Sequence, residues 1–133
     1  MPEGLFQRGR IMMTLTTGVD AVEISRIRKA MERPGFLPRF FAPEELAYFE
    51  SRKMAPQTVA GHFAAKEAFS KAMGTGISGF ELREAAVVHD ERGRPEYRLT
   101  GQAARLAEGW RLSLSITHTA DTAIAFATAW KED

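Results

Sequence analysis

The chain contains no cysteine among its 133 residues. This absence excludes a disulfide framework, a cysteine-ligated zinc or iron–sulfur site and a cysteine nucleophile. A chain of this length buries roughly two-thirds of the surface that it exposes when unfolded, so a core can form without cross-links. We therefore expect a single domain that is stabilised by apolar packing.

An excess of one charge and a long apolar run are lacking as well. The 18 Lys and Arg residues nearly balance the 17 Asp and Glu residues, so there is no overall positive field of the kind that nucleic-acid-binding proteins use. No run of about 18 apolar residues is present, so no transmembrane helix is expected. The first residues include Glu3, Gln7 and two arginines in place of the apolar centre of a signal peptide. We expect a cytoplasmic protein with neither a membrane nor a nucleic-acid partner.

The spacing of apolar residues divides the chain into a helical first half and a second half rich in strands. Residues 1–12 show no pattern and form an N-terminal extension that is a candidate for disorder, and residues 13–133 form the single domain. Helices are expected at 22–31, 58–73 and 102–108 and after Pro43, and strands at 15–20, 85–89, 96–99, 112–117 and 122–130. The predicted class is α+β, with a small, mostly antiparallel sheet packed with helices.

The predicted helix at 58–73 carries the most informative polar residues. On a helix, Glu67, Ser70 and Lys71 share one face beside the ring of Phe63. A solvated pair between Glu67 and Lys71, worth a few tenths of a kcal/mol, explains this face without any function. The alternative interpretation is that the helix face with Glu67, Ser70 and Lys71 forms one part of a functional site.

Two residues elsewhere supply the chemistry of that second interpretation. Asp20 ends the first predicted strand, and His118 lies in the turn between the last two. Asp20 and Glu67 could together hold Mg²⁺, which takes few protein carboxylates and completes its coordination with water and phosphate oxygens. Lys71, one helical turn from Glu67, would then neutralise a diphosphate. The spacing leaves open whether these residues meet in the fold.

Four stretches of the sequence resemble holo-acyl-carrier-protein synthases of the 4'-phosphopantetheinyl transferase superfamily. They are GVDAVEISRI at 18–27, FAAKEAFSKAMGTGI at 63–77, GRP at 93–95 and SLSITHT at 113–119. The resemblance runs from about residue 18 to residue 129, with the stretches in the family's order and spacing. It implies the fold of that superfamily, assembled as a homotrimer with each active site between two subunits.

The resemblance also implies an activity and the residues that perform it. Enzymes of this family transfer 4'-phosphopantetheine from coenzyme A to a serine of apo acyl carrier protein, in support of fatty acid biosynthesis, and release adenosine 3',5'-bisphosphate. In this sequence Asp20 and Glu67 match the magnesium ligands, and Lys71 matches the lysine that faces the phosphates of coenzyme A. Gly74 matches a close backbone approach to coenzyme A, although a plain helix stop explains it too. His118 matches a histidine that lines the nucleotide site.

The implied chemistry is a direct, in-line phosphoryl transfer. Negative charge develops on the diphosphate oxygens, where Mg²⁺ and Lys71 would stabilise it. The acceptor of the serine proton is open between a metal-bound water, which we favour, and Glu67. Two other functions are weighed against this one: a non-catalytic module that binds coenzyme A or a carrier protein, and a magnesium-dependent pyrophosphate hydrolase.

Basic residues follow Asp20 at helical spacing. Arg26, Lys29 and Arg33 stand at i, i+3 and i+7, which is typical of a solvated helix face. Because acyl carrier proteins are acidic, the resemblance makes these residues a candidate docking surface that would speed the encounter electrostatically.

Two further features leave alternatives open. Phe36, Phe40 and Phe41 fall in a predicted loop, where they would be either anchors of a subunit interface or ordinary core residues. His62 stands directly before Phe63, where the family frequently has an arginine, and this departure puts a phosphate contact from that position in question.

Overall fold

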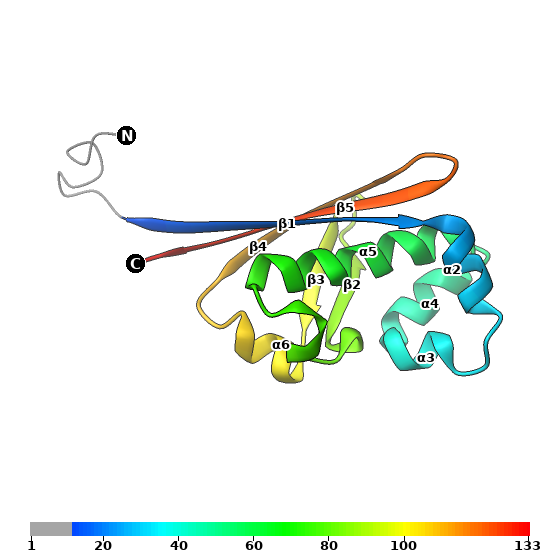
Figure 1. The fold of residues 1–133 in the computed structure, drawn as a ribbon, viewed down its shortest axis with the longest axis horizontal. Coiled ribbons are helices and arrows are strands. Elements are labelled where there is room, and N and C mark those ends of the chain that lie inside the picture. The colour runs from blue at the N-terminus through cyan, green and yellow to red at the C-terminus, as the bar shows by residue number, and fades with distance from the viewer. Residues whose placement is uncertain (1–11) are drawn as a thin grey trace.

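The computed structural model describes residues 12–133, so residues 1–11 of the predicted extension lie outside the described part of the chain. The α helices are α2 (Ile24–Met31), α3 (Phe36–Phe40), α4 (Pro43–Ser51), α5 (Pro56–Met73) and α6 (Gly101–Leu106), and the strands are β1 (Met13–Glu23), β2 (Ala85–His89), β3 (Pro95–Leu99), β4 (Arg111–His118) and β5 (Thr122–Glu132). Two short 3-10 helices, Gly76–Gly79 and Leu82–Glu84, connect α5 to β2. The predicted α+β class is confirmed (Figure 1).

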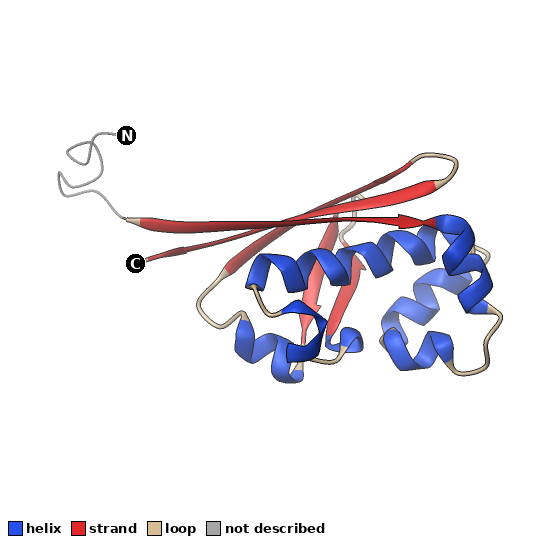
Figure 2. Cartoon of the chain, in the orientation of Figure 1, coloured by secondary structure: helices blue, strands red, loops and turns tan. Residues whose placement is uncertain are grey.

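The strands form two antiparallel sheets. The larger sheet has the order β1-β5-β4, and β2 and β3 form a separate hairpin. All the helices lie on one side of the larger sheet, and the long helix α5 runs directly along it (Figure 2). Within the described residues no helix is both long and apolar enough to span a membrane.

Small side chains let α5 lie very close to the larger sheet. Four successive inward-facing residues of β5 are fully buried alanines. They are Ala123, Ala125, Ala127 and Ala129. The closest approach is at Gly18 of β1, where an added Cβ would lie 2.0 Å from the backbone oxygen of Ala68 and 2.7 Å from the backbone nitrogen of Ala72. The helix therefore rests on the backbone of β1, with no room for a side chain at Gly18.

We predict that Gly18→Ala lowers the free energy of unfolding by about 3 kcal/mol or more, at or above the upper end of the usual cost of overpacking, because the clash is with backbone atoms. Gly61→Ala is the matched control, since a Cβ there meets only the Cγ2 methyl of Ile116 at 2.9 Å and alanine favours the helix. Urea unfolding of both variants measures the difference. Equal, small losses would contradict this description of the packing.

Strand β1 is longer than the sequence predicts. It pairs with β5 along its whole length, from Met13 opposite Glu132 to Glu23 opposite Thr122. The apolar spacing predicts a helix from residue 22, but residues 22 and 23 are the last two residues of β1. Their pairing with β5 outweighs the local helical pattern. As a result, Asp20 lies within the strand and not at its end.

The segment predicted as a phenylalanine-rich loop is helical and packed. Phe36 and Phe40, four residues apart in α3, both contact the ring of Phe63 on α5, with centroids 6.5 Å and 6.4 Å away. Phe41 is 1% exposed and packs against Phe49 of α4. These rings hold α3 and α4 against α5, so the core interpretation of Phe41 is confirmed.

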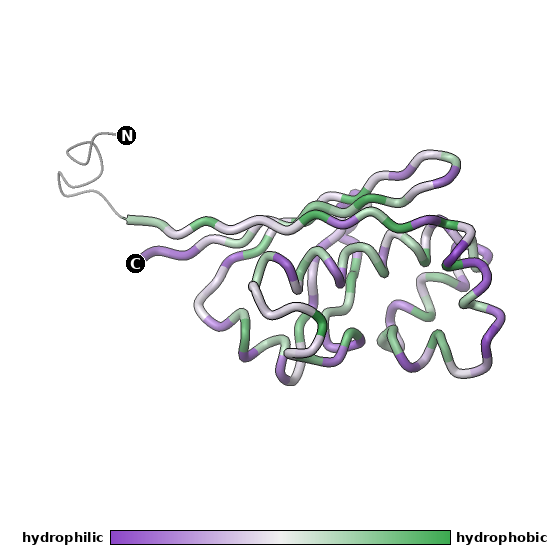
Figure 3. The backbone as a smooth tube through the Cα atoms, viewed as in Figure 1, coloured by the Kyte–Doolittle hydropathy of each residue, from purple (hydrophilic) through white to green (hydrophobic). Residues whose placement is uncertain are grey.

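Within residues 12–133 no element packs on the other side of the larger sheet, where several side chains are apolar. Leu15, Val19 and Phe126 are 63%, 53% and 44% exposed. Val19 stands directly opposite Phe126 in the pairing register, and Leu15 stands opposite Trp130. Figure 3 shows hydrophobic positions along these strands, on the side of the molecule without helices.

Candidate active site

Lys71 joins α5 to β1. Its ammonium group donates hydrogen bonds to Oδ1 of Asp20, 3.1 Å away, and to the backbone carbonyl of Val19, 2.9 Å away. The side chain of Asp20 is 17% exposed and that of Lys71 is 54% exposed, so the pair borders solvent. Helix spacing alone would pair Lys71 with Glu67. In the structure Lys71 bonds instead to the neighbouring strand β1.

Glu67 lies one turn before Lys71 and is half-buried. Burial raises the pKa of its carboxyl group, and the nearby carboxylate of Asp20 raises it further, while Lys71 and Arg26 oppose the shift. The two acids, far apart in the sequence, thus lie close enough to repel each other. A divalent cation between the two carboxylates would relieve this repulsion and lower the pKa of Glu67.

Two other members of the predicted helix face behave differently from Glu67 and Lys71. Ser70 is 2% exposed, and its hydroxyl donates to the backbone carbonyl of Glu67 at 2.7 Å, so it serves its own helix. Gly74 ends α5 with a φ of 72°, which confirms the predicted helix stop. Its approach to coenzyme A stays a prediction.

A buried ionic network ties α4 to α5, and the sequence analysis did not anticipate it. Glu45 accepts hydrogen bonds from Lys66 at 2.6 Å and from Nδ1 of His62 at 2.9 Å, and its other contact is the backbone N–H of Ala42 at 3.0 Å. The Lys66 ammonium also bonds to the carbonyls of Leu82 and Ala85. In the sequence, the pattern that could have indicated this network is the i, i+4 spacing of His62 and Lys66 on the alanine-rich side of α5.

We predict that Glu45→Gln lowers the free energy of unfolding by about 3–5 kcal/mol at pH 7, because it leaves a buried ammonium without a counter-charge. Burial already holds the pKa of Lys66 below its ordinary value. Without Glu45 the folded state binds fewer protons than the unfolded state, so stability rises with pH. The loss should shrink between pH 7 and pH 9 in urea unfolding.

The control for this prediction is the double variant Glu45→Gln with Lys66→Met, which also removes the buried ammonium group. It should be more stable than Glu45→Gln alone and show little pH dependence over the same range. A single variant as stable as the wild type, or a loss that does not change with pH, would contradict a buried charged pair.

His118 lies apart from the Asp20 group within one chain. It is the last residue of β4 and stands opposite Ala123, whereas Asp20 on β1 stands opposite Ala125. The two strands are the opposite edges of the larger sheet. Helix α5 crosses between these edges: its Ala68 and Ala72 contact β1, and its Gly61 contacts Ile116 of β4. The structure therefore brings Asp20, Glu67 and Lys71 together and leaves His118 at the other edge, beside the first turns of α5.

The basic residues predicted to share one helix face do so only in part. Arg26 and Lys29 are exposed on α2, and Arg26 lies near enough to influence Glu67. Helix α2 ends at Met31, so Arg33 lies beyond it, and the expectation of one continuous helical face is wrong for that residue. Arg33 instead borders a cavity of about 470 Å³ together with Phe36, Arg39 and Phe40.

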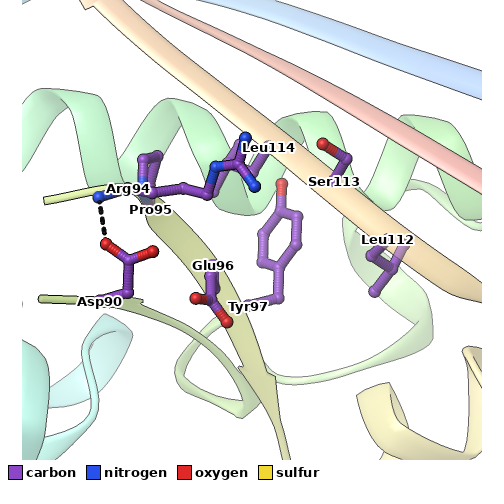
Figure 4. Close-up of a pocket in the computed structure, with 8 residues that line it drawn as sticks. All are labelled: Asp90, Arg94, Pro95, Glu96, Tyr97, Leu112, Ser113 and Leu114. Atoms are coloured by element: carbon purple, nitrogen blue, oxygen red, sulfur yellow. Dashed lines mark hydrogen bonds between the residues drawn. The ribbon is translucent and has the colours of Figure 1, made fainter. Parts of the chain in front are cut away.

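Another cavity, of about 430 Å³, lies between the β2–β3 hairpin and β4 (Figure 4). Tyr97 points across it toward α5, where its hydroxyl donates to the carbonyl of Ala65 at 2.5 Å. At the tip of the hairpin, Asp90 accepts from the backbone N–H of Arg94 at 2.8 Å. None of the predicted site residues lines this cavity, and Tyr97 acts there as a structural link between β3 and α5.

Comparisons with known proteins identify the family of this chain. Residues 16–127 match the model of the family ACPS, the 4'-phosphopantetheinyl transferase superfamily. The chain belongs to that superfamily. The family resemblance that the sequence motifs indicate is thereby confirmed, and the match includes every residue of the Asp20, Glu67 and Lys71 group.

Individual members of the family support the same assignment. The chain is 44% identical over 119 residues to the holo-[acyl-carrier-protein] synthase of Clostridium novyi, a match that covers 86% of each protein. It resembles the Chronobacterium ammoniagenes ACPS–CoA complex with a TM-score of 0.76 and 34% identity, covering 87% of this chain and 96% of that one. The corresponding values for the Bacillus anthracis holo-(acyl-carrier-protein) synthase in complex with CoA (3',5'-ADP) are 0.78 and 31%, with 90% and 99% covered.

Proposed function

We propose that this chain is a magnesium-dependent holo-[acyl-carrier-protein] synthase. It transfers 4'-phosphopantetheine from coenzyme A to a serine of apo acyl carrier protein and releases adenosine 3',5'-bisphosphate. The observation that carries the proposal is the meeting of Asp20, Glu67 and Lys71 at one edge of the sheet in a chain of this family. Relatives named as holo-[acyl-carrier-protein] synthases, and related structures that contain coenzyme A, support the substrates.

The donor set fits magnesium. Asp20 and Glu67 offer two carboxylates beside solvent, and Mg²⁺ is commonly bound by one or two carboxylates, water and substrate phosphates. Burial and the nearby charge of Asp20 raise the pKa of Glu67, and a divalent cation bound between the two carboxylates would lower it. When bound, the metal supplies Lewis-acid stabilisation of charge on the diphosphate. Asp20 and Glu67 would hold it.

The protein's own residues then have distinct roles in the transfer reaction. Lys71, fixed by Asp20 and the carbonyl of Val19, presents a positive charge to the phosphate oxygens as the bond to the adenosine bisphosphate group breaks. Asp20 and Glu67 are committed to the metal, so we assign proton transfer from the carrier serine to water and not to Glu67. Exposed Arg26, Lys29 and Arg33 attract the acidic carrier protein to the same end of β1.

We further propose that the chain works as a homotrimer with its sites shared between subunits, in the cytoplasm. Two observations support this assembly. Leu15, Val19 and Phe126 form an apolar patch on the sheet that no part of residues 12–133 covers. His118, the residue that matches the family's nucleotide-site histidine, lies across the sheet from Asp20, an arrangement that fits a site completed by a neighbouring chain.

The experiment that tests the activity is incubation of the protein with coenzyme A, Mg²⁺ and apo acyl carrier protein, followed by mass measurement of the carrier. We expect a gain of one phosphopantetheine group, prevented by EDTA. Glu67→Gln should lose about 100-fold or more in rate, because metal stabilisation of the transition state is worth several kcal/mol.

The matched control is Ser70→Ala, a change on the same helix of a hydroxyl that bonds only to its own backbone, and it should retain most of the activity. An unmodified carrier, under conditions in which a known transferase modifies it, would overturn the proposed function and favour a non-catalytic module that binds coenzyme A or the carrier. Full activity of Glu67→Gln would overturn the metal assignment alone.

A further inference from the structure

Two basic side chains lie beside the carboxylates of Asp20 and Glu67. Lys71 bonds to Oδ1 of Asp20 and is, within residues 12–133, the only salt-bridge partner of that carboxylate. Both Lys71 and Arg26 are close enough to act on the charge of Glu67. With all four groups ionised, the two acids and the two bases cancel. The protein therefore balances the charge of its own proposed metal ligands.

A divalent cation held by these carboxylates alone would disturb that balance. It would leave the group with an excess of positive charge, and the ammonium group of Lys71 lies only 3.1 Å from Asp20, one of the ligands. Like charges this close repel each other, and the repulsion is stronger than in bulk water because Asp20 is largely shielded from solvent. Lys71 therefore opposes the binding of a divalent cation to the free protein.

The diphosphate of coenzyme A brings charge of the opposite sign. Each of its two phosphates is negatively charged, so the diphosphate alone would give the site an excess of negative charge. A divalent cation and the diphosphate together restore the balance. Mg²⁺ also commonly completes its coordination with phosphate oxygens of a substrate. The metal and the diphosphate are therefore expected to favour each other at this site.

Lys71 is able to bond to the diphosphate from its present position. An ammonium group has three donors, and in Lys71 one goes to Asp20 and one to the carbonyl of Val19. Its side chain is exposed to solvent, so the third N–H is accessible to a phosphate oxygen. Lys66 on the same helix differs, because it is fully buried and its three hydrogen bonds all go to protein groups. Of these two lysines, only Lys71 is placed to respond to a ligand.

Resting on the proposed function, we propose that Lys71 couples the binding of the metal to the binding of coenzyme A. In the free protein its charge is paired with Asp20 and weakens the affinity of the site for a divalent cation. When the diphosphate binds, its oxygens accept the third N–H and neutralise the ammonium group, so the charge of Asp20 becomes available to the metal.

This coupling acts in both directions. Coenzyme A strengthens the binding of the metal by some factor, and by linkage the metal strengthens the binding of coenzyme A by the same factor. The protein consequently takes up the two together and holds a divalent cation tightly only when the substrate is present. The charge of Lys71, and not its packing, sets the size of this factor.

Binding of Mn²⁺ to the free protein tests the inference directly. Mn²⁺ shares the preference of Mg²⁺ for carboxylate and water ligands, and EPR measures its free concentration in a titration without coenzyme A. Lys71→Met should bind Mn²⁺ about tenfold more tightly than the wild type, because the opposing charge is gone. Lys71→Arg keeps the charge and should bind as weakly as the wild type. Adding Glu67→Gln to Lys71→Met should remove the gain, because the ion would lose one of its ligands.

The matched control is Lys53→Met, which removes an exposed lysine outside the site. Lys53 precedes α5 and Lys71 lies in its last turn, so most of the helix length, well beyond the screening distance of about 8 Å at physiological salt, separates the two. This variant should bind Mn²⁺ as the wild type does. Lys71→Met that binds no more tightly than the wild type, or an equal gain in Lys71→Arg or Lys53→Met, would overturn the inference.

A second measurement reports the coupling itself. Saturating coenzyme A should tighten the binding of Mn²⁺ to the wild type by a factor about tenfold larger than for Lys71→Met, after the chelation of Mn²⁺ by coenzyme A alone is measured in titrations without protein. Equal tightening in the two proteins would contradict the role assigned to Lys71. Every arm measures binding without a carrier protein, so these outcomes are distinct from failure of the proposed function, which is a carrier that stays unmodified.

Discussion

The contact between the backbone of β1 and the backbone of α5 at Gly18 sets the position of everything else in this protein. With no side chain at Gly18 and four successive alanines on the inner side of β5, the helix lies directly on the sheet. Asp20 follows Gly18 by two residues and therefore faces the same side, where Lys71 reaches it across a 3.1 Å hydrogen bond. The proposed magnesium site is thus a consequence of close packing, since a wider separation would move Glu67 and Lys71 away from Asp20.

A second constraint acts at the other end of the helix. Glu45 binds both Lys66 and His62, which fixes α4 against α5 and holds the imidazole of His62 in one orientation. The same helix therefore presents carboxylate and ammonium groups at the β1 edge and an imidazole at the β4 edge. One helix thus links the β1 edge of the sheet, where Asp20 lies, to the β4 edge that carries His118.

The family and the α+β class could be predicted from the sequence, because the motifs and the apolar spacing are local features of the chain. The chemistry assigned to Asp20, Glu67 and Lys71 stays a prediction. The remaining features depend on tertiary contacts. Pairing with β5 extends β1 past Asp20, and contact with Phe63 turns the predicted loop at Phe36 into helix. Burial of Lys66 and His62 could not be read from their polarity, since it requires Glu45 from another helix. The separation of His118 from Asp20 follows only from the strand order β1-β5-β4.

The central claim is that the two parts of the site lie at opposite edges of one chain and meet only between chains. Subunit complementation tests it most directly: Asp20→Asn and His118→Ala proteins are assayed separately and after joint refolding. We expect each alone to be severely impaired and the mixed assembly to regain activity, up to roughly a quarter of the wild-type value for randomly mixed neighbours. Activity of the mixture no greater than the sum of its two parents would contradict a shared site.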